Sequence, residues 1–334
     1  MSLKENSLAL SNAWFAGGRG TAMDIAEQLL SPIAQCERLP GGLTATIKGR
    51  TDRTILFDAH IDEIALFVTA VNGGFVKVAA AGGFDSRMLP ATRVVIHGKK
   101  DIIGVFCSTP PHLIQEKSKV QKLDEMYIDT LLLDASEFIS VGDAVTFAVE
   151  AVELSPGVIT GKAFDDRVAC AVLIEVENRI SGMDLPCNVC ISLSDAEEIG
   201  SRGAKTTAYA VMPDEAVTID VGFANGPDIP PEKSGKPGGG VMLGISPILD
   251  CKITELLKNI CNKKQLPFQM EVTGGTTSTN ADAITVTAGS VPTGLCSIPL
   301  RNMHTTVETV WMKDLETVVE LLTEYALRGG VLNA

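Results

Sequence analysis

The second half of the chain alternates strand-like and helix-like segments, and this alternation constrains the fold more than any other feature. Short β-branched runs predict the strands, and apolar residues at helical spacing predict the helices. The expected strands lie at residues 187–194, 215–220, 268–272 and 291–296, and the expected helices at residues 166–180, 248–263 and 313–327. Such alternation is typical of an α/β domain that is built on a largely parallel sheet.

The N-terminal 66 residues have the same pattern of helix-like and strand-like segments. A helix is expected over residues 20–33, where apolar residues recur at helical spacing and Thr21 precedes them as an N-cap. Strand-like runs follow at residues 43–47 and 54–58. We therefore expect the two ends of the chain, residues 1–66 and 157–334, to build one discontinuous α/β domain.

The middle of the chain, residues 67–156, has a different texture. Short β-branched runs alternate with Gly, Pro and Asp turns, and the helical period is weak. The runs lie at residues 75–78, 93–97, 102–106 and 144–147. This pattern predicts a small all-β unit, a barrel or a sandwich, inserted into the α/β domain. A self-association unit, a lid over the site and a decorative insertion are the three interpretations open for it.

Composition and charge exclude several classes of protein. The 334 residues include 28 Lys and Arg against 41 Asp and Glu, so the net charge is −13 and a nucleic-acid partner is not expected. No run of about 18 apolar residues is present, so no membrane span is expected either. The start of the chain lacks the pattern of a signal peptide. The eight cysteines are scattered along the chain, which does not fit a disulfide framework. A cytoplasmic protein is therefore expected, with Cys187 and Cys190 entering a buried strand rather than binding zinc.

Five short stretches contain clustered acids and histidines, and four of them follow a strand-like run. The stretches are His60-Ile61-Asp62-Glu63, Asp165-Asp166-Arg167, Asp195-Ala196-Glu197-Glu198, Asp220 and His304. Ligands of open α/β sheets gather at the carboxyl ends of the strands, so these side chains are expected to converge. Imidazoles and carboxylates without a thiolate suit Zn²⁺, and also Co²⁺ or Mn²⁺.

The spacing within two stretches suggests how their side chains divide the work. His60 and Asp62 leave an extended chain on the same face, so Asp62 can accept the second ring N–H of a metal-binding imidazole. Of the adjacent Glu197 and Glu198, one can bind metal while the other takes a proton from an activated water. Each feature also has an ordinary structural explanation. For example, Asp165 alone could cap a helix that starts at the next residue. Their occurrence together in one chain favours a metal site.

Five sequence blocks, taken together and in order, resemble those of the TET-type metallo-aminopeptidases over nearly the full length of the chain. That family includes glutamyl and deblocking aminopeptidases and proteins once described as cellulases or endoglucanases. The blocks are residues 58–64, residues 161–167, residues 195–204, Asp220 and residues 298–308. The resemblance implies a zinc-peptidase-like, three-layer α/β domain with a central mixed, largely parallel sheet. It also implies that residues 67–156 are an inserted, barrel-like dimerisation domain.

The resemblance further implies a site with two divalent metal ions, of which zinc is expected first and cobalt or manganese next. Asp165 would bridge the two ions, Glu197 would act as the general base, and Asp62 would orient His60. The implied metal ligands are His60, Asp165, Glu198, Asp220 and His304. Such an enzyme would remove residues from short peptides that have a free N-terminus, with water activated between the metals. It would assemble from dimers into a homo-oligomer, a dodecamer in this family.

Other functions stay open at this point. A dinuclear deacylase or amidohydrolase of the same fold would act on a blocked substrate, and a glycosidase would need two carboxylates and no metal. A non-catalytic binding protein on this fold is a further alternative. The chain departs from the family pattern at residues 15–20, at residues 129–140 and at Thr305-Thr306. None of these positions is an implied ligand, but the N-terminal departure bears on contacts at the rim of the site. The side-chain specificity is left undetermined.

Overall fold

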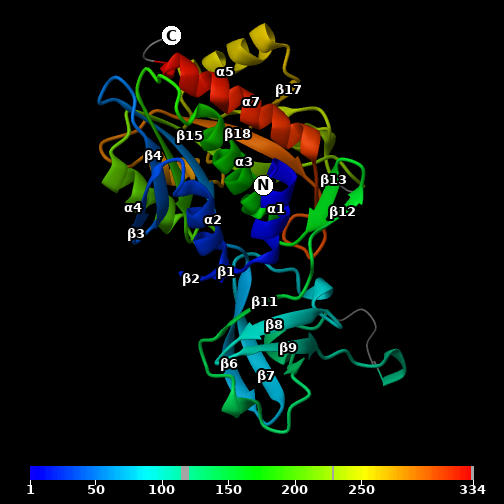
Figure 1. Ribbon diagram of the computed structural model, residues 1–334. Coiled ribbons are helices and arrows are strands. Elements are labelled where there is room, and N and C mark those ends of the chain that lie inside the picture. The colour runs from blue at the N-terminus through cyan, green and yellow to red at the C-terminus, as the bar shows by residue number, and fades with distance from the viewer. Residues whose placement is uncertain (114–119, 228, 332–334) are drawn as a thin grey trace.

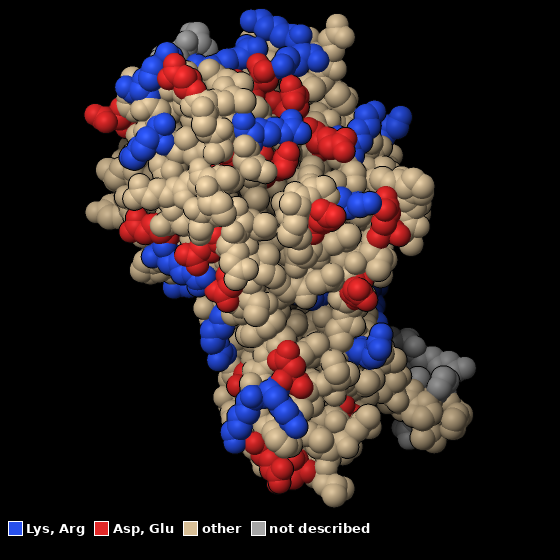
Figure 2. All heavy atoms as spheres, in the orientation of Figure 1, with Lys and Arg blue, Asp and Glu red and all other residues tan. Residues whose placement is uncertain are grey.

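The computed structural model describes residues 1–113, 120–227 and 229–331. Figure 1 shows an α/β unit that contains both ends of the chain, with a smaller unit of strands projecting from it. Lys and Arg side chains are interspersed with Asp and Glu on the face drawn in Figure 2. Among the described residues, no helix is both long enough and apolar enough to cross a membrane.

The α/β unit is built on an eight-stranded mixed sheet. In spatial order the strands are β17 (Phe268–Val272), β16 (Val241–Ile245), β18 (Thr293–Leu300), β15 (Glu215–Phe223), β5 (Thr54–His60), β14 (Asn188–Ser194), β4 (Gly42–Ile47) and β3 (Gln35–Leu39). The central strands β18, β15, β5 and β14 run parallel to one another, as do β16 and β17. This confirms the expected central sheet, which is mixed and largely parallel.

Helices cover both faces of the sheet and make three layers. One face carries α1 (Leu3–Asn12), α2 (Ala22–Leu30), α3 (Phe164–Ile180), α5 (Cys251–Lys264) and α7 (Met312–Arg328), and the other carries α4 (Arg202–Val211) and α6 (Ala281–Ile284). Every residue of β14 is buried because helices pack on both of its sides. Cys187 and Cys190 are buried there, as expected.

The strands of the smaller unit form a closed barrel with its own apolar core. Its members are β6 (Ala65–Asn72), β7 (Phe75–Ala81), β8 (Arg93–His97), β9 (Asp101–Phe106), β10 (Ile128–Asp129) and β11 (Ala144–Phe147). Two small sheets lie outside it, made of β12 (Val152–Ser155), β13 (Val158–Gly161) and β19 (Glu308–Trp311), and of β1 (Phe15–Ala16) and β2 (Arg19–Gly20). Short 3-10 helices lie at Ser86–Met88, Pro111–Leu113, Leu123–Glu125, Ala135–Glu137 and Pro231–Lys233. A division into domains at residues 67 and 156 stays a prediction.

The N-terminal region differs from the expectation in two details. The helix predicted over residues 20–33 is shorter, because α2 ends at Leu30. The Thr21 side chain makes no capping hydrogen bond, since its backbone is already helical where a capping residue is normally extended. Helix α1 was not predicted from the pattern of apolar residues. Its buried side includes Asn6, Ser7 and Ser11, so the face that packs on α3 is partly polar.

Candidate metal centre

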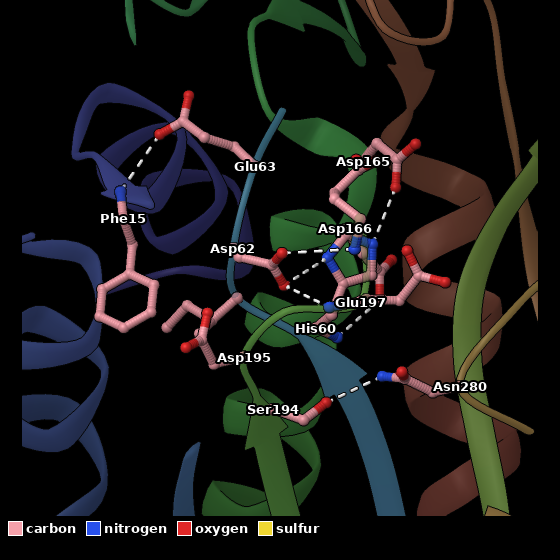
Figure 3. Close-up of polar contacts among 12 residues, drawn as sticks. Phe15, His60, Asp62, Glu63, Asp165, Asp166, Ser194, Asp195, Glu197 and Asn280 are labelled. Atoms are coloured by element: carbon pink, nitrogen blue, oxygen red, sulfur yellow. Dashed lines mark hydrogen bonds and ion pairs between the residues drawn. The ribbon is translucent and has the colours of Figure 1, made fainter. Parts of the chain in front are cut away.

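The carboxyl ends of the parallel strands bring the predicted site residues together (Figure 3). His60 is the last residue of β5, and it pairs in register with Ser194 at the end of β14. Glu197 and Glu198 follow that end of β14, and Asp220 lies in β15, which pairs with β5 on its other side. A cavity of about 760 Å³ opens here, lined by Asp165, Glu197, Glu198, Asp220 and His304 among other residues.

Asp165 lies between the two imidazoles of the site. Its Oδ1 atom is 3.0 Å from Nε2 of His60, and its Oδ2 atom is 3.1 Å from Nε2 of His304. The same His304 nitrogen is 3.3 Å from Oε1 of Glu198. His60, Asp165 and Glu198 each have one potential ligand atom, a ring nitrogen or a carboxylate oxygen, within 4.8 Å of those of the other two. A carboxylate with one oxygen toward each imidazole is well placed to be shared between two cations.

A second group of potential ligand atoms also includes His60. Here His60, Asp166 and Asp220 have ligand atoms within 4.8 Å of one another. Oδ2 of Asp166 accepts a hydrogen bond from the backbone N–H of His60 (3.3 Å), whereas its buried Oδ1 has no partner among the described residues. The sequence interpretation gave Asp166 no role beyond beginning a helix. Its position directly after Asp165 was the available signal.

The electrostatics of the centre favour a bound cation. Burial raises the pKa of Glu197 to about 7, and it also raises the pKa of Glu198 and of Asp220. Burial alone would lower the pKa of His304, but hydrogen bonds to Asp165 and Glu198 outweigh it and raise the value to about 11. Carboxylates are therefore crowded where water cannot screen them. Together with the orphaned oxygen of Asp166, this set of nitrogen and oxygen donors fits divalent metal ions.

Asp62 connects the end of β5 to the segment that follows β14. Its Oδ1 atom is 3.4 Å from Nδ1 of His60. Its two oxygens also accept hydrogen bonds from the backbone N–H groups of Glu197 (3.1 Å) and Glu198 (3.3 Å). The carboxylate therefore holds the segment after β14 against the end of β5, which goes beyond the orientation of one imidazole that the sequence suggested.

A buried group of charges fixes the segments that carry His60 and Asp165. Glu63 accepts hydrogen bonds from Lys162 Nζ (2.6 Å), from Arg167 Nη2 (2.8 Å) and from the backbone N–H of Phe15 (3.2 Å; Figure 3 shows the last). Arg167 also donates from Nε to the carbonyl of Ile61 (3.0 Å). These contacts join residues 61–63, residues 162–167 and the N-terminal segment into one support for the centre.

Glu308 is a supporting residue that the sequence did not identify. Its carboxylate accepts hydrogen bonds from the backbone N–H groups of Asp165 (3.1 Å) and His304 (2.7 Å). Burial raises the pKa of Glu308 to about 8. Nδ1 of His304 is in turn 3.0 Å from the carbonyl oxygen of Gly83, which follows barrel strand β7. Contacts to backbone groups leave no spacing pattern in a sequence. The one available signal for Glu308 was that it lies four residues after His304.

Glu308→Ala is expected to weaken metal binding by about 10- to 100-fold, as is usual when the group that positions a ligand is removed. It should also lower the free energy of unfolding by about 1–3 kcal/mol, because two buried N–H groups lose their acceptor. Metal titration and denaturant unfolding measure the two effects. The matched variant Glu308→Gln keeps a carbonyl oxygen and should lose less of both. Equal behaviour of Glu308→Ala and the unmodified chain would rule out this supporting role.

Imidazoles and carboxylates gathered at the carboxyl ends of parallel strands are typical of metallohydrolases. The sequence profile of M42 glutamyl aminopeptidases matches residues 41–321, and the chain belongs to this family of peptidases. A putative aminopeptidase of Acetivibrio thermocellus is 30% identical, over 92% of this chain and 94% of its own length. This confirms the TET-type resemblance.

Solved structures agree with the family assignment. The TET aminopeptidase of the marine sediment archaeon Thaumarchaeota archaeon SCGC AB-539-E09 superposes with a TM-score of 0.93 at 29% identity, covering 99% of this chain and 97% of its own. The Pyrococcus horikoshii TET1 peptidase, which can assemble into a tetrahedron or a large octahedral shell, gives a TM-score of 0.85 at 26% identity, covering 98% and 99%.

Proposed function

We propose that the chain is a dinuclear, metal-dependent aminopeptidase. Asp165 would be shared between the two ions, and its position between His60 and His304, with one oxygen directed at each, is the observation that carries the proposal. His60 and Asp220 would complete one site, and Glu198 and His304 would complete the other. Zinc is the first candidate, followed by cobalt and manganese, because all three accept imidazole and carboxylate ligands.

In this mechanism the metals supply Lewis acidity, which polarises the scissile carbonyl and makes water acidic enough to deprotonate. Glu197 takes that proton and later returns it to the departing amine. Glu197 lines the cavity together with Asp165 and Glu198, so its carboxylate lies beside the proposed metal site. Asp62 holds the backbone of Glu197 in place through the 3.1 Å hydrogen bond to its N–H.

A panel of aminoacyl-p-nitroanilides, assayed with metal-reconstituted protein beside N-acetylated controls, tests this function. An aminopeptidase cleaves substrates with a free α-amine and leaves the acetylated ones intact. Cleavage of the acetylated substrates alone would show a deacylase or another amidohydrolase. Failure to cleave any member of the panel would contradict the proposed activity.

Metal content gives an independent prediction. Elemental analysis of gently purified protein should approach two equivalents of zinc, cobalt or manganese per chain, because Asp165 has one carboxylate oxygen toward each of the two imidazoles. A chelator should abolish peptide hydrolysis, and added metal should restore it. Metal binding should weaken as the pH falls, since protons compete for the imidazoles and carboxylates. A content near zero, with no activation by added metal, is the contrary result.

We also propose that the chain forms a homo-oligomer, built from dimers into a dodecamer, with the barrel as an assembly element. The support is the TET1 peptidase of similar fold, which can assemble into a tetrahedron or a large octahedral shell and has a solved structure with a dodecamer in the asymmetric unit. Further support comes from large apolar side chains that the barrel exposes, such as Leu131 and Leu133.

A further inference from the structure

The cavity beside the metal centre extends along the sheet to a carboxylate outside the proposed ligand set. Glu271 lies in β17, the edge strand, on the far side of β16 and β18 from Asp220. Asp220, Ser297 and Glu271 all line this one cavity, so their side chains occupy the same face of the sheet. The cavity therefore contains the proposed metal ligands at one end and the Glu271 carboxylate further along its wall.

The Glu271 side chain reaches back across the sheet toward the centre. Its partner in register on β16 is Gly244, and the side chains of Leu295 and Leu249 pack directly over this glycine. Its Oε2 atom accepts a hydrogen bond from Oγ of Ser297 on β18 (2.5 Å). A methyl group added at Gly222 would lie 2.9 Å from its Oε1 atom. Gly222 comes two residues after Asp220, about 6.6 Å along the strand, so the carboxylate lies roughly one extended side chain from the centre.

Part of the cavity lining is apolar, although Thr273, Ser278 and Thr279 also line it. Leu249 and Leu295 line the cavity and are almost fully buried. Ile245 and Val286 also line it, and both are substantially exposed, at 43% and 65%. A side chain with an aliphatic stem can therefore pack along the cavity and place a polar tip at the carboxylate.

Glu271 has no cation to neutralise it among the described residues. Burial raises the pKa of its carboxyl group, opposed by the hydrogen bond from Ser297, and Oε1 accepts no hydrogen bond within the described part of the chain. Lys205 lines the same cavity from α4, but it forms no ion pair with Glu271. Asp282 differs from Glu271, because its oxygens already accept hydrogen bonds from Thr277 and Ser278.

We propose that Glu271 makes this enzyme select peptides whose N-terminal residue is lysine or arginine. The inference rests on the proposed aminopeptidase function, which places the α-amine and first carbonyl of the substrate at the metal centre. The substrate side chain then runs along the apolar part of the lining, and its cationic end pairs with the Glu271 carboxylate. The four-carbon stem of lysine suits this span. A glutamyl side chain, which the family name would suggest, would meet a like charge and be rejected.

Matched substrates test the selection directly. Lysyl- and norleucyl-p-nitroanilide have the same aliphatic stem, and only the lysyl compound carries the ammonium group. We expect the kcat/KM ratio of lysyl to norleucyl substrate to exceed about tenfold, and Glu271→Gln to lower it by about 10- to 100-fold, the range of one charge-assisted hydrogen bond. Glutamyl-p-nitroanilide should be the poorest substrate of the unmodified enzyme.

The control is Glu316→Gln, which removes the same charge from an exposed position on α7, on the opposite face of the sheet. It should leave the ratio unchanged. An unmodified enzyme that cleaves norleucyl substrate as fast as lysyl substrate overturns the inference, even if Glu271→Gln fails to fold. A Glu271→Gln variant that keeps the full ratio overturns it as well. Neither result touches the proposed aminopeptidase activity, which is contradicted if no substrate with a free α-amine is cleaved.

Discussion

Glu197→Gln should lower kcat by about 10²- to 10⁴-fold while the protein keeps its fold and both metal ions. Glutamine has nearly the same shape as glutamate but cannot take up a proton from water. Glu197 lines the cavity, yet it belongs to neither group of potential ligand atoms found among the described residues. Metal retention is therefore expected. The measurements are kcat with the aminoacyl-p-nitroanilide that the unmodified enzyme cleaves best, and metal per chain by elemental analysis.

The neighbouring residue provides the matched control. Glu198 lies in the ligand group with His60 and Asp165, and its Oε1 atom is 3.3 Å from Nε2 of His304. Glu198→Gln removes one negative charge at the same depth and should release about one metal equivalent per chain. If Glu197→Gln kept full turnover, or lost metal while Glu198→Gln did not, the two roles would have to be exchanged.

The sequence was informative where chemistry and topology coincide. His60 and Glu197 are polar residues at or just beyond the ends of apolar strands, and Asp220 lies near the end of β15. Parallel strands bring such ends together. Alternation of strands and helices predicted an α/β domain with a largely parallel sheet for a similar reason, and the family resemblance implied its three layers. Helices on both sides bury β14 completely, which leaves an apolar run that is easily recognised.

Other parts of the site could not be predicted, because their roles depend on backbone groups or on distant strands. The Glu308 carboxylate accepts hydrogen bonds from the backbone N–H groups of Asp165 and His304. The carbonyl oxygen of Gly83 lies against Nδ1 of His304. Glu271 reaches the cavity only because β17 lies beside β16, and no local pattern gives that neighbour relation. Sequence spacing reports which residues share a face of one element, whereas these contacts join separate elements.

The barrel contacts the metal centre as well as projecting from the α/β unit, and this affects how its proposed role in assembly is tested. Gly83 follows β7, and its carbonyl oxygen is 3.0 Å from Nδ1 of His304. Trp14 of the N-terminal segment stacks on His97 of β8, with ring centroids 3.9 Å apart. Replacing the whole insertion with a linker would therefore disturb the centre along with any interface. Point substitutions on the outer surface of the barrel separate the two effects.

Leu131→Asp combined with Leu133→Asp should lower the mass of the assembly several-fold. These side chains are 83% and 101% exposed in the loop between β10 and β11, and exposed apolar side chains of this size are typical of interfaces. Light scattering of the unmodified chain should give a mass near twelve times the 35.3 kDa of one chain. The double variant should form a smaller species and keep about two metal ions per chain, because no proposed ligand lies in the barrel.

Met183→Asp is the matched control, since it places the same charge at an exposed apolar position after α3, outside the barrel. It should leave the mass unchanged. A mass near 35 kDa for the unmodified chain would refute self-assembly, and a dimer would remove support for the tetrahedral shell alone. A double variant that stays fully assembled would place the contacts elsewhere. The role of the barrel would then be to support the metal centre, through the contact between the carbonyl oxygen of Gly83 and His304.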